Sequence, residues 1–283
     1  MCYLLNWGAK KKMADIPAGP AQYLTRFGEQ AIAGNQYALT KLGIDRAHCS
    51  LKIEEYLILC VPFQLGFKRS VFMASLSKQE LAFFQKYLNG IAGLSLALNP
   101  KKKPEPIKFF LRCTLTTVGQ MKGRENVGLF VVDYKTSPGE MVSILGNFME
   151  TQERLKTQYE DYGKTSIRIT PAVAKMMGYN LYATITQPNT PPRRVQVFNL
   201  NSKTIEHLEA ASASVLNPGT SVTYQLFFQK FRITVNATIT AVNTLSQGIT
   251  RNTASLEFSP ELVEIIDEYW YSTLVNSPQK PIH

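Results

Sequence analysis

Residues 129–149 read LFVVDYKTSPGEMVSILGNFM, and residues 254–270 read ASLEFSPELVEIIDEYW. Each stretch starts with the apolar residues of a β-strand, passes through Ser-Pro and a glutamate, and continues with apolar residues at helical spacing. Proline and acidic residues are both favoured in the first turn of a helix. The repeated order of strand, Ser-Pro, glutamate and helix therefore predicts two related modules.

The residues before each stretch form short apolar, β-branched or aromatic runs separated by turn residues, which is typical of strands. In the first half we predict strands at Tyr56–Val61, Ser70–Ala74, Leu94–Leu98, Ile107–Leu115 and Leu129–Tyr134. In the second half we predict them at Leu181–Thr186, Arg194–Leu200, Ser221–Phe228, Phe231–Val242 and Thr253–Phe258. Ser77 and Glu80 form a capping box that predicts a helix within Ser77–Leu88. Each half fits a barrel-like sheet followed by a helix.

The chain before the first strand is predicted to be a helical lead-in. Its apolar spacing indicates one or two helices between Pro20 and Leu42, which end at Gly43. Residues 1–12 place apolar residues before three lysines, Lys10, Lys11 and Lys12, which reverses the order of a secretory signal. We interpret residues 1–12 as a misassigned start before Met13 or as a loosely held extension whose deletion leaves the fold intact.

The 283 residues suit two ordinary domains. Charged residues between positions 150 and 170 predict the solvated end of a helix followed by an interdomain connector. We therefore divide the chain into the extension and lead-in, residues 1–46, a first barrel with its connecting helix, residues 47–162, and a second barrel with a terminal helix, residues 163–283.

The composition is that of a globular protein, with 45% hydrophobic and 18% charged residues and a net charge of +10. The basic excess lies in residues 1–179, which contain 24 Lys and Arg against 14 Asp and Glu, whereas residues 180–283 contain seven of each. Lys101, Lys102 and Lys103 lie in a Pro-flanked loop, where a solvated turn is expected, so nucleic-acid binding is disfavoured. No apolar run reaches the roughly 18 residues of a membrane span.

The sequence carries no motif that indicates catalysis. Its cysteines, Cys2, Cys49, Cys60 and Cys113, are scattered among apolar residues, which predicts neither a disulfide framework nor a zinc site and favours a reducing cytoplasm. His48 precedes a predicted strand and His207 falls in a predicted polar turn, so neither has metal spacing. A nucleophile elbow, a phosphate-binding glycine loop and a dinucleotide fingerprint are missing. We expect a binding protein that is not an enzyme and that has no metal or cofactor.

Two further stretches carry a family resemblance. Residues 193–204 read RRVQVFNLNSKT and residues 217–222 read NPGTSV, and together they resemble the first strands of a PilZ domain. Upstream, residues 123–130, the helix through Ile144-Leu145-Gly146, and Thr170-Pro171 before Lys175-Met176-Met177-Gly178 resemble two-domain spirochaete PilZ proteins. The resemblance implies a mainly β fold with helices (α+β), in which two six-stranded antiparallel β-barrels are each followed by a helix, after a helical lead-in.

The resemblance also implies cyclic di-GMP as the ligand. A PilZ site uses an Arg-x-x-x-Arg pair whose planar guanidinium groups bind guanine edges and phosphates. The matching positions are Lys164 and Arg168, and lysine keeps the charge but lacks the fork. Arg168 also lies between Ile167 and Ile169, so a solvated strand edge is the competing interpretation.

The second PilZ motif would fall on Asn199, Asn201 and Thr204, where asparagine replaces a serine and threonine replaces a glycine. A β-branched threonine disfavours the positive φ that glycine supplies, so we expect a turn of another shape. Arg193 and Arg194 could add a substitute anion contact, or they are ordinary solubilising residues after Pro191-Pro192.

The ligand-binding candidates are thus Lys164, Arg168, Arg193, Arg194, Asn199 and Asn201. We expect a cytoplasmic regulatory protein of the cyclic di-GMP receptor lineage, with an altered nucleotide site that binds weakly or not at all, acting through an unidentified protein partner. The family resemblance implies signalling and motility regulation. The alternative is a scaffold that binds its partner without any nucleotide, and a nucleic-acid binder would instead show strongly salt-dependent binding.

Overall fold

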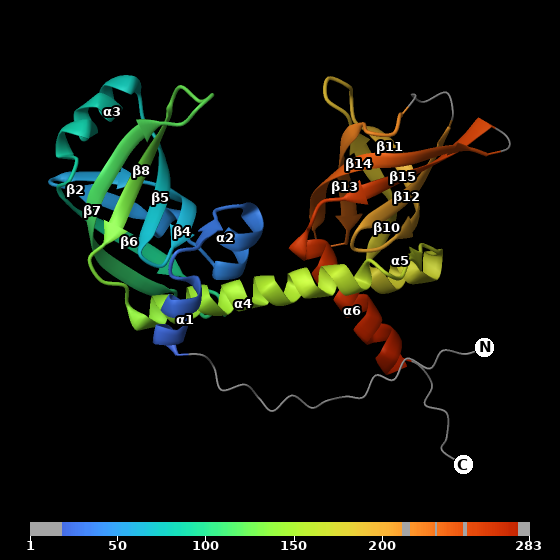
Figure 1. Cartoon of the computed structure of the whole chain (residues 1–283), viewed down its shortest axis with the longest axis horizontal. Coiled ribbons are helices and arrows are strands. Elements are labelled where there is room, and N and C mark those ends of the chain that lie inside the picture. The colour runs from blue at the N-terminus through green and yellow to red at the C-terminus, as the bar shows by residue number, and fades with distance from the viewer. Residues whose placement is uncertain (1–18, 211–215, 230, 246–247, 277–283) are drawn as a thin grey trace, which may run out of the picture. The chain divides into compact units, whose positions relative to one another are not determined.

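The computed structural model describes residues 19–210, 216–229, 231–245 and 248–276 (Figure 1). The expectations for residues 1–12 lie outside this range. The chain forms two compact units, of which the first extends to Glu150 and the second begins at Thr151. None of the described helices is both long and apolar enough to cross a membrane.

Unit 1 is built on one antiparallel sheet with the strand order β1-β4-β5-β8-β7-β6-β2-β3. The strands are β1 (Ala31–Ala33), β2 (Ser50–Ile53), β3 (Tyr56–Leu59), β4 (Val61–Gly66), β5 (Arg69–Ser75), β6 (Ile91–Leu98), β7 (Ile107–Gln120) and β8 (Val127–Tyr134). Only Cys60 separates β3, which pairs with β2, from β4, which pairs with β5. The chain from Tyr56 to Gly66 therefore belongs to both ends of the sheet, as a bent strand of a barrel does.

This arrangement gives unit 1 eight strands where the family resemblance implies six. The bend at Cys60 divides the predicted strand Tyr56–Val61 in two, and β1 and β2 are short segments that the sequence analysis did not resolve as strands. When β3 and β4 are counted together, six strands remain besides the three-residue β1. The inward residues of these strands form one core, which includes Phe72, Leu94, Leu111 and Phe130.

The helical lead-in is confirmed as α1 (Pro20–Phe27) and α2 (Gln36–Leu42). Gly43 ends α2 with a φ of 60°, in the left-handed region that glycine adopts most readily. The insertion after β5 is α3 (Lys78–Phe84), and the Ser77–Glu80 capping box is present, because the Ser77 hydroxyl accepts from the Glu80 amide and the Glu80 carboxylate accepts from the Ser77 amide. Two 3₁₀ turns, Arg46–His48 and Gln85–Tyr87, complete the unit.

Helix α4 (Gly139–Tyr162) begins in unit 1 after the predicted Ser-Pro signal. Met141, Val142 and Leu145 are fully buried, and α1 lies against this end of α4 (Figure 1). The Tyr23 hydroxyl of α1 donates to Asn147 Oδ1 at 2.8 Å and to Glu150 Oε2 at 3.0 Å. The last turns of α4 belong to unit 2, where the Tyr159 hydroxyl donates to the Leu256 carbonyl at 3.0 Å.

Unit 2 contains a closed six-stranded antiparallel barrel, which confirms this part of the predicted fold. Its strands follow the order β10-β13-β14-β15-β12-β11, and β10 also pairs with β11, with β9 added outside β11. They are β9 (Ile167–Arg168), β10 (Tyr179–Thr186), β11 (Arg193–Leu200), β12 (Thr204–Ala210), β13 (Ser221–Phe228), β14 (Arg232–Thr244) and β15 (Ile249–Leu256). Helices α5 (Pro171–Met177) and α6 (Pro260–Asn276) complete the unit, and Leu262, Val263 and Ile266 bury one face of α6.

The contact between α1 and α4 generates a prediction for unit 1. A Cβ atom on Gly146 would lie 2.2–2.5 Å from three ring carbons of Tyr23, and this ring is itself buried. Gly146→Ala should gain up to about 1 kcal/mol of helix propensity but force the ring out of place at a cost of about 1–3 kcal/mol. We therefore expect a net loss of stability for unit 1 in urea denaturation.

Gly119→Ala in β7 is the matched control, because no atom lies within 4 Å of the added methyl group. The predicted packing is contradicted if Gly146→Ala raises the unfolding midpoint of unit 1 or if both variants change it equally.

Candidate functional site

Arg168 and Asn199 lie directly opposite each other where β9 pairs with the end of β11. The Arg168 guanidinium is exposed and its central carbon lies 4.6 Å from the centre of the Phe198 ring. The Asn199 amide donates to Glu206 Oε2 at 2.8 Å across the β11–β12 ladder. The structure therefore brings these two candidates together, on the outside of the barrel.

Lys164 and Asn201 flank the same end of the barrel, but each has a partner of its own. The Lys164 ammonium donates to Asp161 at 2.7 Å, and this hydrogen bond raises the pKa of the exposed lysine. Asn201 is buried, with its Oδ1 accepting from the amides of Lys203 at 2.8 Å and Thr204 at 2.6 Å. Its Nδ2 donates to the Gly163 carbonyl at 3.3 Å. Asn201 thus shapes the turn between β11 and β12 and ties it to the residue after α4.

Thr204 begins β12 with a φ outside the left-handed region. The threonine therefore takes part in the sheet where the family motif has glycine.

Arg193 and Arg194 lie at the opposite end of β11. Arg194 is exposed and its guanidinium carbon lies 3.6 Å from the centre of the Tyr182 ring. Arg193 points to Glu209, with its Nε 2.9 Å from Glu209 Oε2 and its Nη1 donating to Gln187 Oε1 at 3.0 Å. Five strand positions separate Arg194 from Asn199, which corresponds to about 17 Å. The six candidates therefore form two groups rather than one site.

Arg193 belongs to a buried polar network that the sequence analysis missed. His207 was predicted in a polar turn, and that prediction is wrong, because His207 lies in β12 and is fully buried. Asn252 Nδ2 donates to Glu209 Oε1 at 2.9 Å and lies 3.2 Å from His207 Nε2, while His207 Nδ1 is 2.9 Å from the Tyr224 hydroxyl. The inward residues of β12 are Ile205, His207 and Glu209. Two of these three are polar, so β12 lacks the alternating apolar residues by which a strand is recognised in a sequence.

The network controls the charge of Glu209. Burial on its own raises the pKa of this carboxyl, but the contacts with His207 and Arg193 outweigh it and hold the pKa below its ordinary value. The side chains of Arg193 and Glu209 are only 17% and 3% exposed. The pair is therefore an internal ion pair and not a solvated surface contact.

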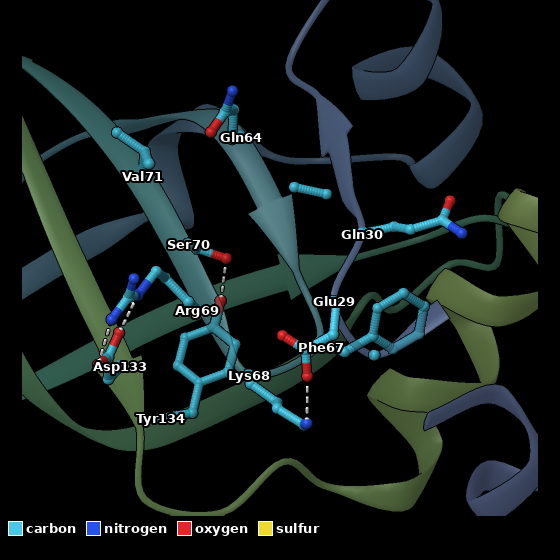
Figure 2. Close-up of a pocket in the computed structure, with 12 residues that line it drawn as sticks. Glu29, Gln30, Gln64, Phe67, Lys68, Arg69, Ser70, Val71, Asp133 and Tyr134 are labelled. Atoms are coloured by element: carbon cyan, nitrogen blue, oxygen red, sulfur yellow. Dashed lines mark hydrogen bonds and ion pairs between the residues drawn. The ribbon is translucent and has the colours of Figure 1, made fainter. Parts of the chain in front are cut away.

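A cavity of about 610 Å³ lies in unit 1 beside the turn between β4 and β5 (Figure 2). Lys68 donates to Glu29 at 2.6 Å, and Arg69 contacts both carboxylate oxygens of Asp133, at 2.5 and 2.8 Å. The Tyr134 hydroxyl lies 2.5 Å from the Ser70 hydroxyl. The charged side chains that line this cavity thus neutralise one another in pairs.

Within the part of the chain that the structure describes, no group of three or more His, Cys, Asp or Glu side chains could hold a metal ion. Cys49 and Cys60 are buried with their sulfur atoms 3.7 Å apart, and Cys113 is also buried. The hydrogen bond with Cys49, together with burial, raises the pKa of the Cys60 thiol. These cysteines therefore behave as core residues.

Residues 21–152 match the model of the PilZN3 domain family. Unit 1 is therefore a PilZN3 domain, and it is followed by a second compact unit. No sequence among the curated proteins matches the chain.

The solved structures that match this chain share little sequence with it. The PlzA protein of Borreliella burgdorferi in complex with cyclic di-GMP has 12% identity and a TM-score of 0.44, covering 88% of this chain and 97% of that one. YcgR from Escherichia coli in complex with cyclic di-GMP has 11% identity and a TM-score of 0.30, over 89% and 96% of the two chains. The inhibitor of motility MotI from Bacillus subtilis has 10% identity and a TM-score of 0.29, over 83% and 100%.

The Arg193–Glu209 pair generates a prediction for unit 2. Glu209→Gln removes the carboxylate and leaves the Arg193 cation in a largely enclosed place, which should lower the free energy of unfolding by about 3 kcal/mol. Urea denaturation at neutral pH measures the loss, and Glu268→Gln on the exposed surface of α6 is the control.

Because the folded pKa of Glu209 is lowered, its contribution is present above the ordinary glutamate pKa and is lost as the pH falls through the folded value. The stability of the unsubstituted chain should therefore fall more steeply below about pH 4 than that of Glu209→Gln. An unchanged midpoint in Glu209→Gln at neutral pH would contradict a stabilising role for the pair.

Proposed function

We propose that this protein is a non-enzymatic, cytoplasmic regulator of the cyclic di-GMP receptor lineage, with an altered nucleotide site that binds weakly or not at all. It acts by binding a protein partner, and motility is the process that the family resemblance implies. The observation that carries the proposal is the commitment of the candidate ligand groups to contacts within unit 2. A PilZN3 domain followed by a closed barrel is the organisation in which such a site is expected.

The first element of a PilZ site, the arginine pair, is reduced to Lys164 and Arg168. Lysine cannot make the bidentate contact of a guanidinium group, and this lysine is also paired with Asp161. A lost bidentate contact costs about 1–3 kcal/mol, by analogy with base recognition, which is about 5-fold to 150-fold in affinity.

The second element, the polar turn, is equally changed. All of the hydrogen bonds of the Asn201 amide described above are made to the backbone of its own unit, so a ligand would have to break them. Arg193 is likewise held by Glu209, and an anion that bound it would leave a buried carboxylate unpaired. With both elements altered, affinity should fall at least about thirty-fold below that of an intact site.

The alternative is a scaffold that binds its partner with no nucleotide ligand at all. The two functions differ in one measurement, because a ligand at a hundred times its dissociation constant stabilises the folded state by about 2.7 kcal/mol. Thermal denaturation with and without cyclic di-GMP separates a weak receptor from a scaffold.

We predict that calorimetric titration with cyclic di-GMP at near-physiological salt detects no micromolar site. If binding is tight, the proposed alteration of the site is wrong, and alanine substitution of Lys164, Arg168, Arg193 and Arg194 one at a time identifies the groups responsible.

If binding is weak or absent, restoring the family residues should recover affinity only when both elements are changed together, with Lys164→Arg for the pair and Asn201→Ser with Thr204→Gly for the turn. A nucleotide held by two elements needs both positioned before it binds. Recovery by either element alone would contradict this coupling. Because Asn201→Ser removes the amide that holds the turn, the melting temperature of each variant is measured first.

We also propose that the second domain begins at residue 163, after the lead-in and first barrel of residues 1–162. Gly163 to Ser166 link the end of α4 to β9, and Lys164 to Ser166 are exposed. Brief trypsin treatment should therefore cut first within residues 150–168, and mass spectrometry identifies the two fragments. Early cleavage within β14 would contradict this boundary.

A further inference from the structure

Strands β3, β2, β6 and β7 present a contiguous outer face in unit 1. Their cross-strand pairs place Leu57, Lys52, Gly93 and Arg112 in one row across the four strands. The next row consists of Leu59, Ser50, Ser95 and Phe110. Residues two apart on a strand share a face, and the alternate residues Leu51, Ile58, Leu94 and Leu111 face the core, so both rows lie on the opposite face of the sheet. Of the residues in these rows, Ser50 is buried.

This outer face carries large apolar side chains that are unusually open to solvent. Phe110 is 78% exposed, Leu57 67%, Leu59 65% and Ile91, which lies on β6 two residues before Gly93, 55%. Single exposed apolar residues are ordinary, but a contiguous group marks an interaction surface.

Small residues separate the two sides of this group. Ser50, Gly93 and Ser95 lie between the leucines of β3 and Phe110 of β7, which are three strand spacings or about 14 Å apart. A Cβ atom on Gly93 would meet only the Cβ of Lys52, at 3.8 Å, so the space above this strand is open. The outer face therefore has small residues between apolar side chains, and we call this surface the furrow.

Three cations lie along the furrow. Lys52, Lys108 and Arg112 are exposed, and Lys108 and Arg112 flank Phe110 on β7. Among the residues that the structure describes, no carboxylate forms an ion pair with any of the three. In contrast, Lys68 and Arg69 of the same unit are both paired with acidic side chains.

We propose that this furrow binds a protein segment that presents glutamate or aspartate side chains together with large apolar side chains on one side. The carboxylates would meet Lys52, Lys108 and Arg112, while the apolar side chains would bury Leu57, Leu59 and Phe110. This inference rests on the proposed function, since it assigns the surface through which a protein partner is bound.

Two other classes of partner fit the furrow less well. Single-stranded nucleic acid binds by stacking its bases on aromatic rings, whereas Leu57, Leu59 and Ile91 are aliphatic. A flat anionic membrane would leave Gly93 and Ser95, which lie between the apolar side chains, uncovered.

Two labelled synthetic peptides of equal length and equal leucine content, one with glutamate and one with lysine at every polar position, test the proposal by fluorescence anisotropy with the full chain. We expect the glutamate peptide alone to bind, with an affinity that falls as salt rises. Lys52→Glu combined with Arg112→Glu, and separately Phe110→Ala, should weaken it at least tenfold. Gly93→Leu should also weaken it, by filling the furrow without changing charge.

Lys78→Glu, an exposed lysine at the start of α3, is the matched control and should leave binding unchanged. Each substituted residue is solvent-exposed, so the melting temperature of every variant should stay at that of the unsubstituted chain. The proposal is overturned if the glutamate peptide binds no tighter than about 1 mM, if both peptides bind equally, or if charge reversal has no effect.

Two further measurements test the rival occupants. A dimer in sedimentation velocity that Phe110→Ala dissociates would assign the furrow to a second copy of the chain. Cosedimentation with phosphatidylcholine vesicles containing phosphatidylserine, lost in the same variant, would assign it to a membrane. Either result overturns the proposal.

The same variants are also titrated with cyclic di-GMP. Their substitutions lie in unit 1, so the affinity for the nucleotide should stay that of the unsubstituted chain. Failure of peptide binding with an unchanged nucleotide titration overturns the furrow alone. Micromolar nucleotide binding overturns the altered site alone.

Discussion

The ladder between β10 and β11 closes the sheet of unit 2, and the arrangement of the candidate residues depends on it. Its four residue pairs join Tyr182–Ile185 to Arg193–Gln196, so both arginines of the β11 entry lie in the closing ladder. One strand face points into a closed barrel and the other to solvent. Closure therefore sends Arg193 toward Glu209 and leaves Arg194 over the ring of Tyr182.

An arginine enclosed at a barrel end needs a countercharge, and this requirement explains the rest of the network. Glu209 supplies the charge, and the Asn252 amide donates to its remaining carboxylate oxygen, while His207 Nε2 lies 3.9 Å from that oxygen. Tyr224 in turn contacts His207 from the facing strand β13. Groups committed in this way stabilise the barrel, and they are poorly suited to exchange their partners for a ligand.

The sequence predicted the features that depend on local patterns. Ser221–Phe228 matches β13 at both ends, and the capping box at Ser77 and the glycine at Gly43 mark helix ends as expected. It did not predict β12, because two of its inward residues, His207 and Glu209, are polar. The bend at Cys60 was also missed, since it depends on pairing with two different strands.

The candidate site was less predictable than the fold, because the availability of a side chain depends on residues distant in sequence. Asn201 bonds to Gly163, 38 positions earlier, and Arg193 bonds to Glu209, 16 positions later. Neither contact leaves a signal in the spacing of residues. Comparison with the family motif identifies the positions at which this chain has a different residue type. Only the structure shows that the side chains of Asn201 and Arg193 already have partners.

The basic residues of the two units differ in whether they have acidic partners. The basic excess of the chain lies before residue 180, and within unit 1 the cations that lack acidic partners include those beside exposed apolar residues of β3 and β7. After residue 180 the charges are balanced, and Arg193 is paired internally with Glu209. Removing water from an unpaired surface cation is favourable only when a binding partner supplies the opposite charge. Arg193 already has its opposite charge in Glu209 and gains less from a bound anion. The physical chemistry thus favours recognition of an acidic partner by unit 1 over binding of an anion by the arginines of unit 2.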